Sequence, residues 1–280
     1  MANEICLDRS VSNYAVFGNP VKHSKSPQIH TLFARQTGIA LNYQSIGVPI
    51  EKFSEYVDLF SSQGGKGLNI TVPFKEEACS LCTTLTQRAE ISGSVNTIQF
   101  DENKNIHGDT TDGQGLINDL TVNHGIKIED KSVLILGAGG SVKAILEPLC
   151  IQKPDQIVIA NRTVSRAEQL ADKFSDQGNI EARSFSELSS RSFDLIINGT
   201  SLSLMGELPP IPENIIDNGA CCYDLMYADK ATIFMQWATE HGASIVLDGL
   251  GMLVEQAAEA FLIWHGVKPD TGSVIKALRN

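Results

Sequence analysis

The sequence lacks a long apolar segment, an excess of basic residues and a metal-binding motif. No apolar run approaches the roughly 20 residues that span a membrane, and the opening stretch MANEICLDRS has no apolar core. Lysine and arginine number 22 against 33 aspartates and glutamates, which gives a formal net charge of −11. This balance argues against a general nucleic-acid or acidic-membrane binder. We therefore expect a cytoplasmic protein with no secretory signal and no nucleic-acid or membrane partner.

The cysteines have a spacing that does not predict a site. With no secretory signal expected, we predict reduced thiols at all six positions. One CxxC is present, but a zinc or redox reading would need a second ligand pair or a thioredoxin-like unit, and we expect no metal. The CxxC pair is interpreted as two buried thiols on one helix face, and the adjacent pair as packing within an apolar strand. The cysteines are Cys6, Cys79, Cys82, Cys150, Cys221 and Cys222.

What is present is a chain of 280 residues, enough for two domains with substantial cores. In the first third, apolar runs alternate with amphipathic segments, as in a parallel or mixed α/β sheet. Strands are predicted at 14–18, 42–48, 67–72, 95–100 and 105–109, and helices at 27–38, 51–65 and 75–91.

The remainder of the chain has the succession of a doubly wound, Rossmann-like sheet. A helix at 113–125 precedes an apolar strand, a glycine turn and a helix within 131–150. Further strands are predicted at 156–160, 193–199, 219–225 and 243–249, with helices at 164–174 and 231–242 between them. Two helices, at 251–266 and 272–278, end the chain without a further strand.

The glycine turn, GAGGSV at 137–142, follows a strand and opens a helix, which is the setting of a dinucleotide-binding loop. Gly137 would permit the tight turn, Gly139 would let the backbone approach a pyrophosphate, and N–H groups at the helix start would face the anion. Val142 occupies a position where glycine or alanine is usual. The alternative is a plain turn between strand and helix.

The stretch NRTVSR, at 161–166, follows the next predicted strand. A dinucleotide site that holds a ribose 2′-hydroxyl usually has an acid here, which would repel a 2′-phosphate. Arg162 and Arg166 could instead clamp such a phosphate, with Asn161 and Thr163 adding neutral hydrogen bonds. The alternative is a solvated basic helix end. Together with the glycine loop, the stretch favours NADP over NAD.

Polar clusters in the first third also follow predicted strands, where α/β sites form. GNPVKHSKSP, NITVPFK and GDTTDG are such clusters, and SVNT lies between the last two. With YAVFGNP, GGKG, TVPFKEEA, GAGG, NRTVSRAE, FDLIIN, DGLGMLV and WHGV, they resemble the shikimate dehydrogenase family in family order from about residue 14 to the C-terminus. The form they resemble is the dedicated NADP-dependent enzyme of chorismate and aromatic amino-acid biosynthesis.

The resemblance implies reversible reduction of 3-dehydroshikimate to shikimate by NADPH, with Lys75 and Asp112 as the catalytic pair. A nearby ammonium can stabilise and protonate the alkoxide that hydride addition leaves, and Asp112 would favour the charged ammonium. Read singly, Lys75 would be a surface lysine at a helix start and Asp112 a helix N-cap.

The resemblance further implies two sets of binding residues. The catalytic pair itself is expected to contact the substrate, together with residues of the polar clusters and two further positions. These other residues are Ser24 and Ser26, on the carboxylate, then Asn69, Thr71, Asn96, Tyr227 and Gln256. Cofactor contacts are expected from the loop, the basic stretch and later strand ends: Gly137, Ala138, Gly139, Gly140, Ser141, Asn161, Arg162, Thr163, Arg166, Thr200, Leu225, Gly249 and Met252.

Three segments depart from the family pattern: Ser141–Val142 replaces a more usual Ala-Ser, Thr110 stands where asparagine is common, and NGTSLSLMG differs after the strand at 193–199. We expect residues 1–111 and 249–280 to form the substrate domain and 112–248 the NADP domain, with the site in a cleft between them, in a monomer or homodimer. Two rival hypotheses are a quinate/shikimate dehydrogenase that accepts NAD and a non-catalytic NADP-binding regulator.

Overall fold

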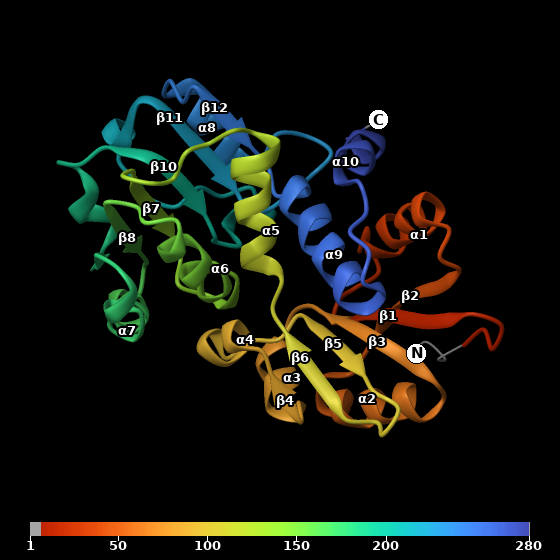
Figure 1. The fold of residues 1–280 in the computed structure, drawn as a ribbon. Helices are drawn as coiled ribbons and strands as arrows, with labels where there is room; N and C mark the ends of the chain where they lie inside the picture. Colours follow the sequence, from red (N-terminus) through yellow and green to blue (C-terminus); the bar gives the residue numbers. More distant parts are fainter. Residues whose placement is uncertain (1–6, 280) are drawn as a thin grey trace. The chain divides into compact units, whose positions relative to one another are not determined.

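The computed structural model describes residues 7–279, and the chain divides into two compact units. The first comprises the described residues up to Gly115 and from Val254 onward, and the second comprises Leu116–Leu253. Figure 1 shows the helices and strands of each unit. One unit boundary falls within helix α5 (Asp112–Asn118) and the other within helix α9 (Leu250–His265). Cys6 lies outside the described residues.

The first unit is built on a mixed six-stranded sheet in the order β2-β1-β3-β5-β6-β4. The first three of these are parallel, whereas β5 runs antiparallel to both β3 and β6, as expected of a strand pair. Their bounds are β1 Ser12–Gly18, β2 Leu41–Gly47, β3 Gly65–Ile70, β4 Thr84–Leu85, β5 Thr97–Phe100 and β6 Ile106–Asp109.

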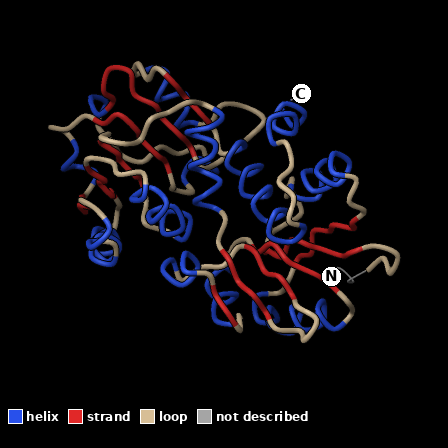
Figure 2. Tube along the Cα trace, viewed as in Figure 1, coloured by secondary structure: helices blue, strands red, loops and turns tan. Residues whose placement is uncertain are grey.

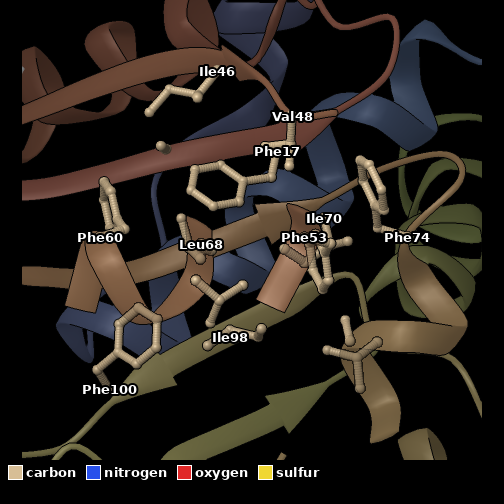
Figure 3. Close-up of a cluster of buried hydrophobic side chains, with 14 of the residues drawn as sticks. Phe17, Ile46, Val48, Phe53, Phe60, Leu68, Ile70, Phe74, Ile98 and Phe100 are labelled. Carbon is tan, nitrogen blue, oxygen red and sulfur yellow. The ribbon is translucent and has the colours of Figure 1, made fainter. Parts of the chain in front are cut away.

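Alternate residues of these strands serve two different faces. One face packs with helices α2 (Phe53–Ser62) and α3 (Lys75–Leu81) into an aromatic-rich cluster around Phe17, which Figure 3 shows beside Leu68 and near Ile46. The opposite face includes Tyr14, Val16 and Tyr43 and packs on α9. The remaining helices of the unit are α1 Ser26–Thr37, α4 Gln87–Ser92 and α10 Thr271–Arg279.

The second unit is a parallel six-stranded sheet, order β12-β11-β10-β7-β8-β9, and Figure 2 shows its strands interspersed with helices. Read from β9, this is the 3-2-1-4-5-6 order of a doubly wound dinucleotide fold, so the predicted fold class is confirmed. The elements are β7 Ser132–Leu136, α6 Gly140–Ile151, β8 Gln156–Ala160, α7 Val164–Lys173, β9 Ile180–Arg183, β10 Phe193–Asn198, β11 Ile216–Asp224, α8 Ile233–Glu240 and β12 Ile245–Leu247.

Both faces of the second sheet are covered, which explains the continuous apolar runs of its central strands. Leu134 and Leu136 of β7 belong to a cluster with Phe234 and Trp237 of α8, and the residues between them in β7 are also fully buried. Asn198, by contrast, is a buried amide at the end of β10, where the apolar run stops.

The structure differs from the sequence prediction at two places. The helix predicted over 75–91 is interrupted, because Cys82 takes an extended conformation after α3 and the short strand β4 then pairs with β6 before α4 begins. Cys79 and Cys82 are therefore only partly buried and do not share one helix face, whereas Cys221 and Cys222 are buried in β11 as predicted. The sequence reading also missed β9, a short strand whose residues are all half-buried.

A glycine in β3 provides a stability test of the packing between β3 and α9. A Cβ atom on Gly67 would lie 2.5 Å from Nε1 of Trp264 and 2.8 Å from the carbonyl oxygen of Ile98. The same Nε1 donates a hydrogen bond to that oxygen at 3.0 Å. Gly67→Ala should therefore lower the free energy of unfolding by about 1–3 kcal/mol, as overpacking does, measured by urea denaturation. Gly47→Ala is the control, because a Cβ there meets nothing within 4 Å. Equal unfolding free energies for the two variants would contradict this account.

Candidate active site

Lys75 and Asp112 form an ion pair at the starts of two helices of the first unit. Lys75 opens α3 shortly after β3, and Asp112 opens α5 soon after β6. The Lys75 Nζ atom lies 2.6 Å from Oδ2 of Asp112, and the side chains are only 20% and 11% exposed. The pair predicted from sequence is thus in direct contact and largely shielded from water. Lys75 is therefore not the exposed surface lysine that it could have been if read alone, and Asp112 is the first residue of α5, with its carboxylate in the ion pair.

The second oxygen of Asp112 is bound by Asn96, immediately before β5. Asn96 Nδ2 donates to Asp112 Oδ1 at 2.9 Å and also lies within hydrogen-bond distance of Thr111 Oγ1 and of Gln256 Oε1 in α9. Asn96 Oδ1 in turn accepts from the backbone N–H of Thr111 at 2.9 Å. Both carboxylate oxygens are therefore held, and four predicted site residues, Lys75, Asn96, Asp112 and Gln256, lie in one network.

Asn69 joins this network from β3. Its Nδ2 atom lies 3.3 Å from the carbonyl oxygen of Asn96 and 3.2 Å from Oγ1 of Thr97. Thr97 Oγ1 donates to Asn96 Oδ1 at 2.9 Å. On the other side, Asn69 Oδ1 accepts from the hydroxyl of Tyr43. Thr97, Thr111 and Tyr43 were not predicted as site residues. SVNT and GDTTDG could have indicated the two threonines, but no sequence signal marks Tyr43.

The remaining predicted substrate residues are arranged separately. Ser24 Oγ accepts from the backbone N–H of Ser26, which is buried at the first position of α1. Thr71 follows β3, and its methyl group lies close to Gly18. A Cβ atom on Gly18 would lie only 2.3 Å from Cγ2 of Thr71. Tyr227 belongs to the second unit and is half-buried, and burial raises the pKa of its phenol.

In the second unit, the glycine loop joins β7 to α6 as predicted. Gly137 has φ +105°, a conformation that disfavours other residues, and a Cβ atom on it would crowd the carbonyl oxygen of Gly199. Gly139 is the N-cap of α6, and a Cβ on Gly139 or Gly140 would meet nothing within 4 Å, so backbone N–H groups there remain approachable. Ala138 and Ser141 complete the loop. This open helix start suits an anionic pyrophosphate.

Val142, which departs from the fingerprint, is fully buried against the end of β10. A Cβ atom on Gly199 would lie 2.5 Å from Cγ2 of Val142. The absent side chain at Gly199 thus accommodates the larger side chain at Val142. Val142 and Gly199, which belong to two of the segments expected to depart from the family pattern, therefore form one packing contact.

The basic stretch begins directly after β8. Asn161 Nδ2 donates to the carbonyl oxygen of Thr163 at 2.9 Å, which shapes the turn into α7. Arg162 and Arg166 are exposed, and neither guanidinium has an acidic partner among the described residues. Uncompensated arginines beside a glycine loop fit a phosphate group better than an internal ion pair would.

A buried carboxylate organises the ends of β10 and β11. Asp224 accepts from Ser203 Oγ at 2.8 Å, from Thr232 Oγ1 at 2.6 Å and from Asn198 Nδ2 at 3.1 Å. Burial raises the pKa of Asp224, and these hydrogen bonds oppose the shift. Asn198 Oδ1 accepts from the hydroxyl and N–H of Thr200, so Asp224 indirectly fixes a predicted cofactor residue. The sequence reading missed this network.

Further predicted cofactor residues lie close to β11. The N–H of Leu225 donates to the carbonyl oxygen of Asn198. Gly249 approaches Leu225 so closely that a Cβ atom would lie 2.2 Å from its carbonyl oxygen. The N–H of Met252, in the first turn of α9, donates to the buried hydroxyl of Tyr223 at 3.3 Å. Thr200, Leu225, Gly249 and Met252 are thus all held near the carboxyl ends of β10 and β11.

Among the described residues, no helix is long and apolar enough to cross a membrane, and no group of three or more metal-ligating side chains is present. His107 of β6, which is not among the predicted site residues, hydrogen-bonds with Thr84 and Asp101. These contacts tie β4 and the β5–β6 turn to β6, which is a structural role.

Comparison with known proteins yields three matching family models. They describe a shikimate dehydrogenase substrate binding domain over residues 16–98, a shikimate/quinate 5-dehydrogenase over 120–205 and a shikimate 5'-dehydrogenase C-terminal domain over 249–279.

Whole-chain relatives agree with these models. A shikimate dehydrogenase (NADP(+)) of Alkalilimnicola ehrlichii is 53% identical over 266 residues, which is 95% of this chain and 98% of that one. The crystal structure of an Ael1 enzyme from Pseudomonas putida has a TM-score of 0.92 at 40% identity, covering 96% of this chain and 98% of that one. The shikimate 5-dehydrogenase of Thermus thermophilus, in complex with NADP(H) and shikimate, has a TM-score of 0.86 at 29% identity, covering 96% and 99%. The chain belongs to the shikimate dehydrogenase family.

Proposed function

We propose that this protein catalyses the reversible NADPH-dependent reduction of 3-dehydroshikimate to shikimate, a step of chorismate and aromatic amino-acid biosynthesis. The observation that carries the proposal is the shielded contact of Lys75 with Asp112 inside the Asn96 network, in a chain of the shikimate dehydrogenase family. A non-catalytic NADP-binding regulator would have no need of a lysine held in this way. The expected working form is a cytoplasmic monomer or homodimer.

The first unit is proposed to bind the substrate and the second to bind NADP. Ser24 and Ser26 would meet the substrate carboxylate, while Asn69, Thr71, Asn96 and Gln256 would meet ring hydroxyls. Hydroxyl and amide groups suit a polyol acid, because an apolar analogue would leave them unpaired. Tyr227 is proposed as a further substrate contact.

When bound, NADPH would supply a hydride to the ketone carbon. The ammonium of Lys75 would donate a proton to the ketone oxygen as that oxygen gains negative charge, which leaves a hydroxyl group and a neutral amine. Asp112 holds the ammonium in place before the transfer, since both of its oxygens are already anchored. Stabilisation that grows as the oxygen becomes charged accelerates the reaction itself.

Cofactor selection is assigned to the basic stretch. The exposed Arg162 and Arg166 would bind the 2′-phosphate of NADP, and the open start of α6 would bind its pyrophosphate. Asn161 and Thr163 would add neutral hydrogen bonds, and Thr200 would lie near the adenosine part. Gly249 and Met252 would border the nicotinamide, and Leu225 would be a further cofactor contact. A quinate/shikimate dehydrogenase that accepts NAD is the alternative. Initial rates with shikimate and quinate, each with NADP and NAD, separate the two.

Replacing Lys75 tests the catalytic assignment. Lys75→Met should lower kcat by roughly 10²–10⁴-fold, the usual loss for a positioned acid–base group, with a much smaller change in the shikimate KM. Steady-state kinetics measures both constants. Lys52→Met is the control, because Lys52 is exposed and forms a surface ion pair with Glu55, whose Oε2 lies 3.5 Å from the Lys52 Nζ atom. A folded Lys75→Met enzyme with near-wild-type kcat would remove Lys75 from the mechanism.

Replacing both loop serines tests carboxylate binding. The double variant Ser24→Ala, Ser26→Ala should raise the shikimate KM by about tenfold or more, since each hydrogen bond to a charged group contributes roughly 1.5–3 kcal/mol. The NADP KM should stay near wild type. The control, Ser62→Ala with Ser80→Ala, removes two exposed hydroxyls that donate to helix carbonyl oxygens. The same shikimate KM in both double variants would refute the assignment.

Replacing Arg162 tests cofactor selection. Arg162→Ala should raise the NADP KM by about tenfold or more, because a charge-assisted hydrogen bond to a phosphate is lost. The NAD KM of the same variant is the internal control, since NAD has no 2′-phosphate. Equal changes in the two constants would show that Arg162 does not recognise the 2′-phosphate.

A further inference from the structure

Tyr43 lies in β2, away from the polar strand ends that predicted the site, yet its hydroxyl reaches the site network. The side chain is buried, and the hydroxyl donates to Oδ1 of Asn69 at 2.7 Å. The ring of His30, from α1, stacks on that of Tyr43 with centroids 4.2 Å apart and planes 7° apart. The position of the phenol is therefore fixed by packing as well as by the hydrogen bond.

The protonation states of this stack are settled by burial. Burial raises the pKa of Tyr43 well above its usual range, and a hydrogen bond with Ser26 opposes the shift only in part. The hydroxyl therefore keeps its proton and remains a donor at any working pH. Burial, together with His265, lowers the pKa of His30 to about 3, so the stacked imidazole is neutral.

The orientation of the Asn69 amide follows from its neighbours. A backbone carbonyl only accepts hydrogen bonds, so the amino group must face the carbonyl oxygen of Asn96 and the amide oxygen must face Tyr43. The bond to Tyr43 is short, whereas the amino group's two bonds are 3.2 and 3.3 Å long. The oxygen end is thus anchored, and the amino end can exchange a weak internal bond for a substrate oxygen.

The donors form one directed chain from Tyr43 to the catalytic pair. Tyr43 donates to Asn69, Asn69 to Thr97, Thr97 to Asn96, and Asn96 to Asp112. Reversing any amide along this chain would place two acceptors or two donors face to face. The hydroxyl of Tyr43 is the outermost donor of the chain, and two backbone groups fix the direction of the chain, the carbonyl of Asn96 and the N–H of Thr111.

We propose that Tyr43 is a positioning residue for substrate binding, whose hydroxyl holds the Asn69 amide in its binding orientation. This inference rests on the proposed function of the first unit. Tyr43 comes from β2 and Asn69 from β3, so their hydrogen bond links the two strands that flank β1. It therefore fixes the oxygen end of the amide and leaves the amino end to meet a substrate oxygen.

The test is Tyr43→Phe, which removes the hydroxyl and keeps the ring that stacks on His30. The shikimate KM should rise about tenfold, which corresponds to ~1.4 kcal/mol at 25 °C. The NADP KM should not change, and kcat should fall less than about twofold. The control is Tyr14→Phe. Tyr14 is a buried tyrosine that lies with Tyr43 on the sheet face that packs on α9, and its ring stacks on that of Trp264 with centroids 4.6 Å apart. A purely structural loss would appear in both variants as a lower melting temperature without a selective rise in the shikimate KM.

A second variant tests the route through Asn69. Asn69→Ala should itself raise the shikimate KM, and adding Tyr43→Phe to it should change that constant by less than about twofold, because the hydroxyl has lost the amide that it holds. Two results would overturn the inference alone while the wild-type enzyme is active. One is an unchanged shikimate KM in Tyr43→Phe, and the other is fully additive effects of the two substitutions in the double variant. A wild-type protein that does not oxidise shikimate with NADP overturns the proposed function, and the inference with it.

Discussion

The anchoring of the Asp112 carboxylate is the constraint on which the candidate active site depends. One oxygen binds the ammonium of Lys75 and the other binds the amide of Asn96, so the group cannot rotate without losing a partner. Removing one member of a buried charge pair typically costs about 3–5 kcal/mol, since the other charge stays behind unpaired. Such a pair is held by its surroundings: helices α3 and α5 contribute its two residues, and α9 contributes Gln256, which binds Asn96.

The two faces of the first sheet make this anchoring possible. Leu68 and Ile70 point into the aromatic cluster around Phe17, while Asn69, between them, points to the opposite face. Thr97 is paired with Asn69 across the sheet and shares its face. The apolar face stabilises the sheet, and the other face can therefore hold polar groups whose hydrogen bonds are satisfied by one another.

Local chemistry accounts for what the sequence could predict. The glycine loop, the basic stretch and the apolar runs of β7, β8 and β10 each have a local physical cause, and family motifs marked Lys75 and Asp112. The break after α3 was not predicted, although the β-branched Thr83 and Thr84 that follow Cys82 favour an extended conformation, and the pairing of β4 with β6 ends the helix there. By contrast, β9 is recognisable only from its partner, since its residues are half-buried on both faces.

The inner residues of the site network could not be predicted from the sequence, for a related reason. Tyr43 is an ordinary strand residue until β2 and β3 are placed on either side of β1, with Tyr43 and Asn69 on the same face. Asp224 and Asn198 similarly appear as the polar ends of two apolar strands, and only the parallel register of β10 and β11 pairs them. Contacts between residues far apart in the chain need the topology, which local patterns do not contain.

The contact between Val142 and Gly199 constrains the order in which these two positions can change during evolution. A chain that first acquired alanine at Gly199 would place its new Cβ 2.5 Å from Val142 Cγ2, so the buried valine side chain would have to shift. A chain that first acquired a smaller residue at Val142 would have only a small void to tolerate, which the second change would then fill. The cofactor loop and the end of β10 are thus linked in their mutational history, and the two paths between the arrangements differ in cost.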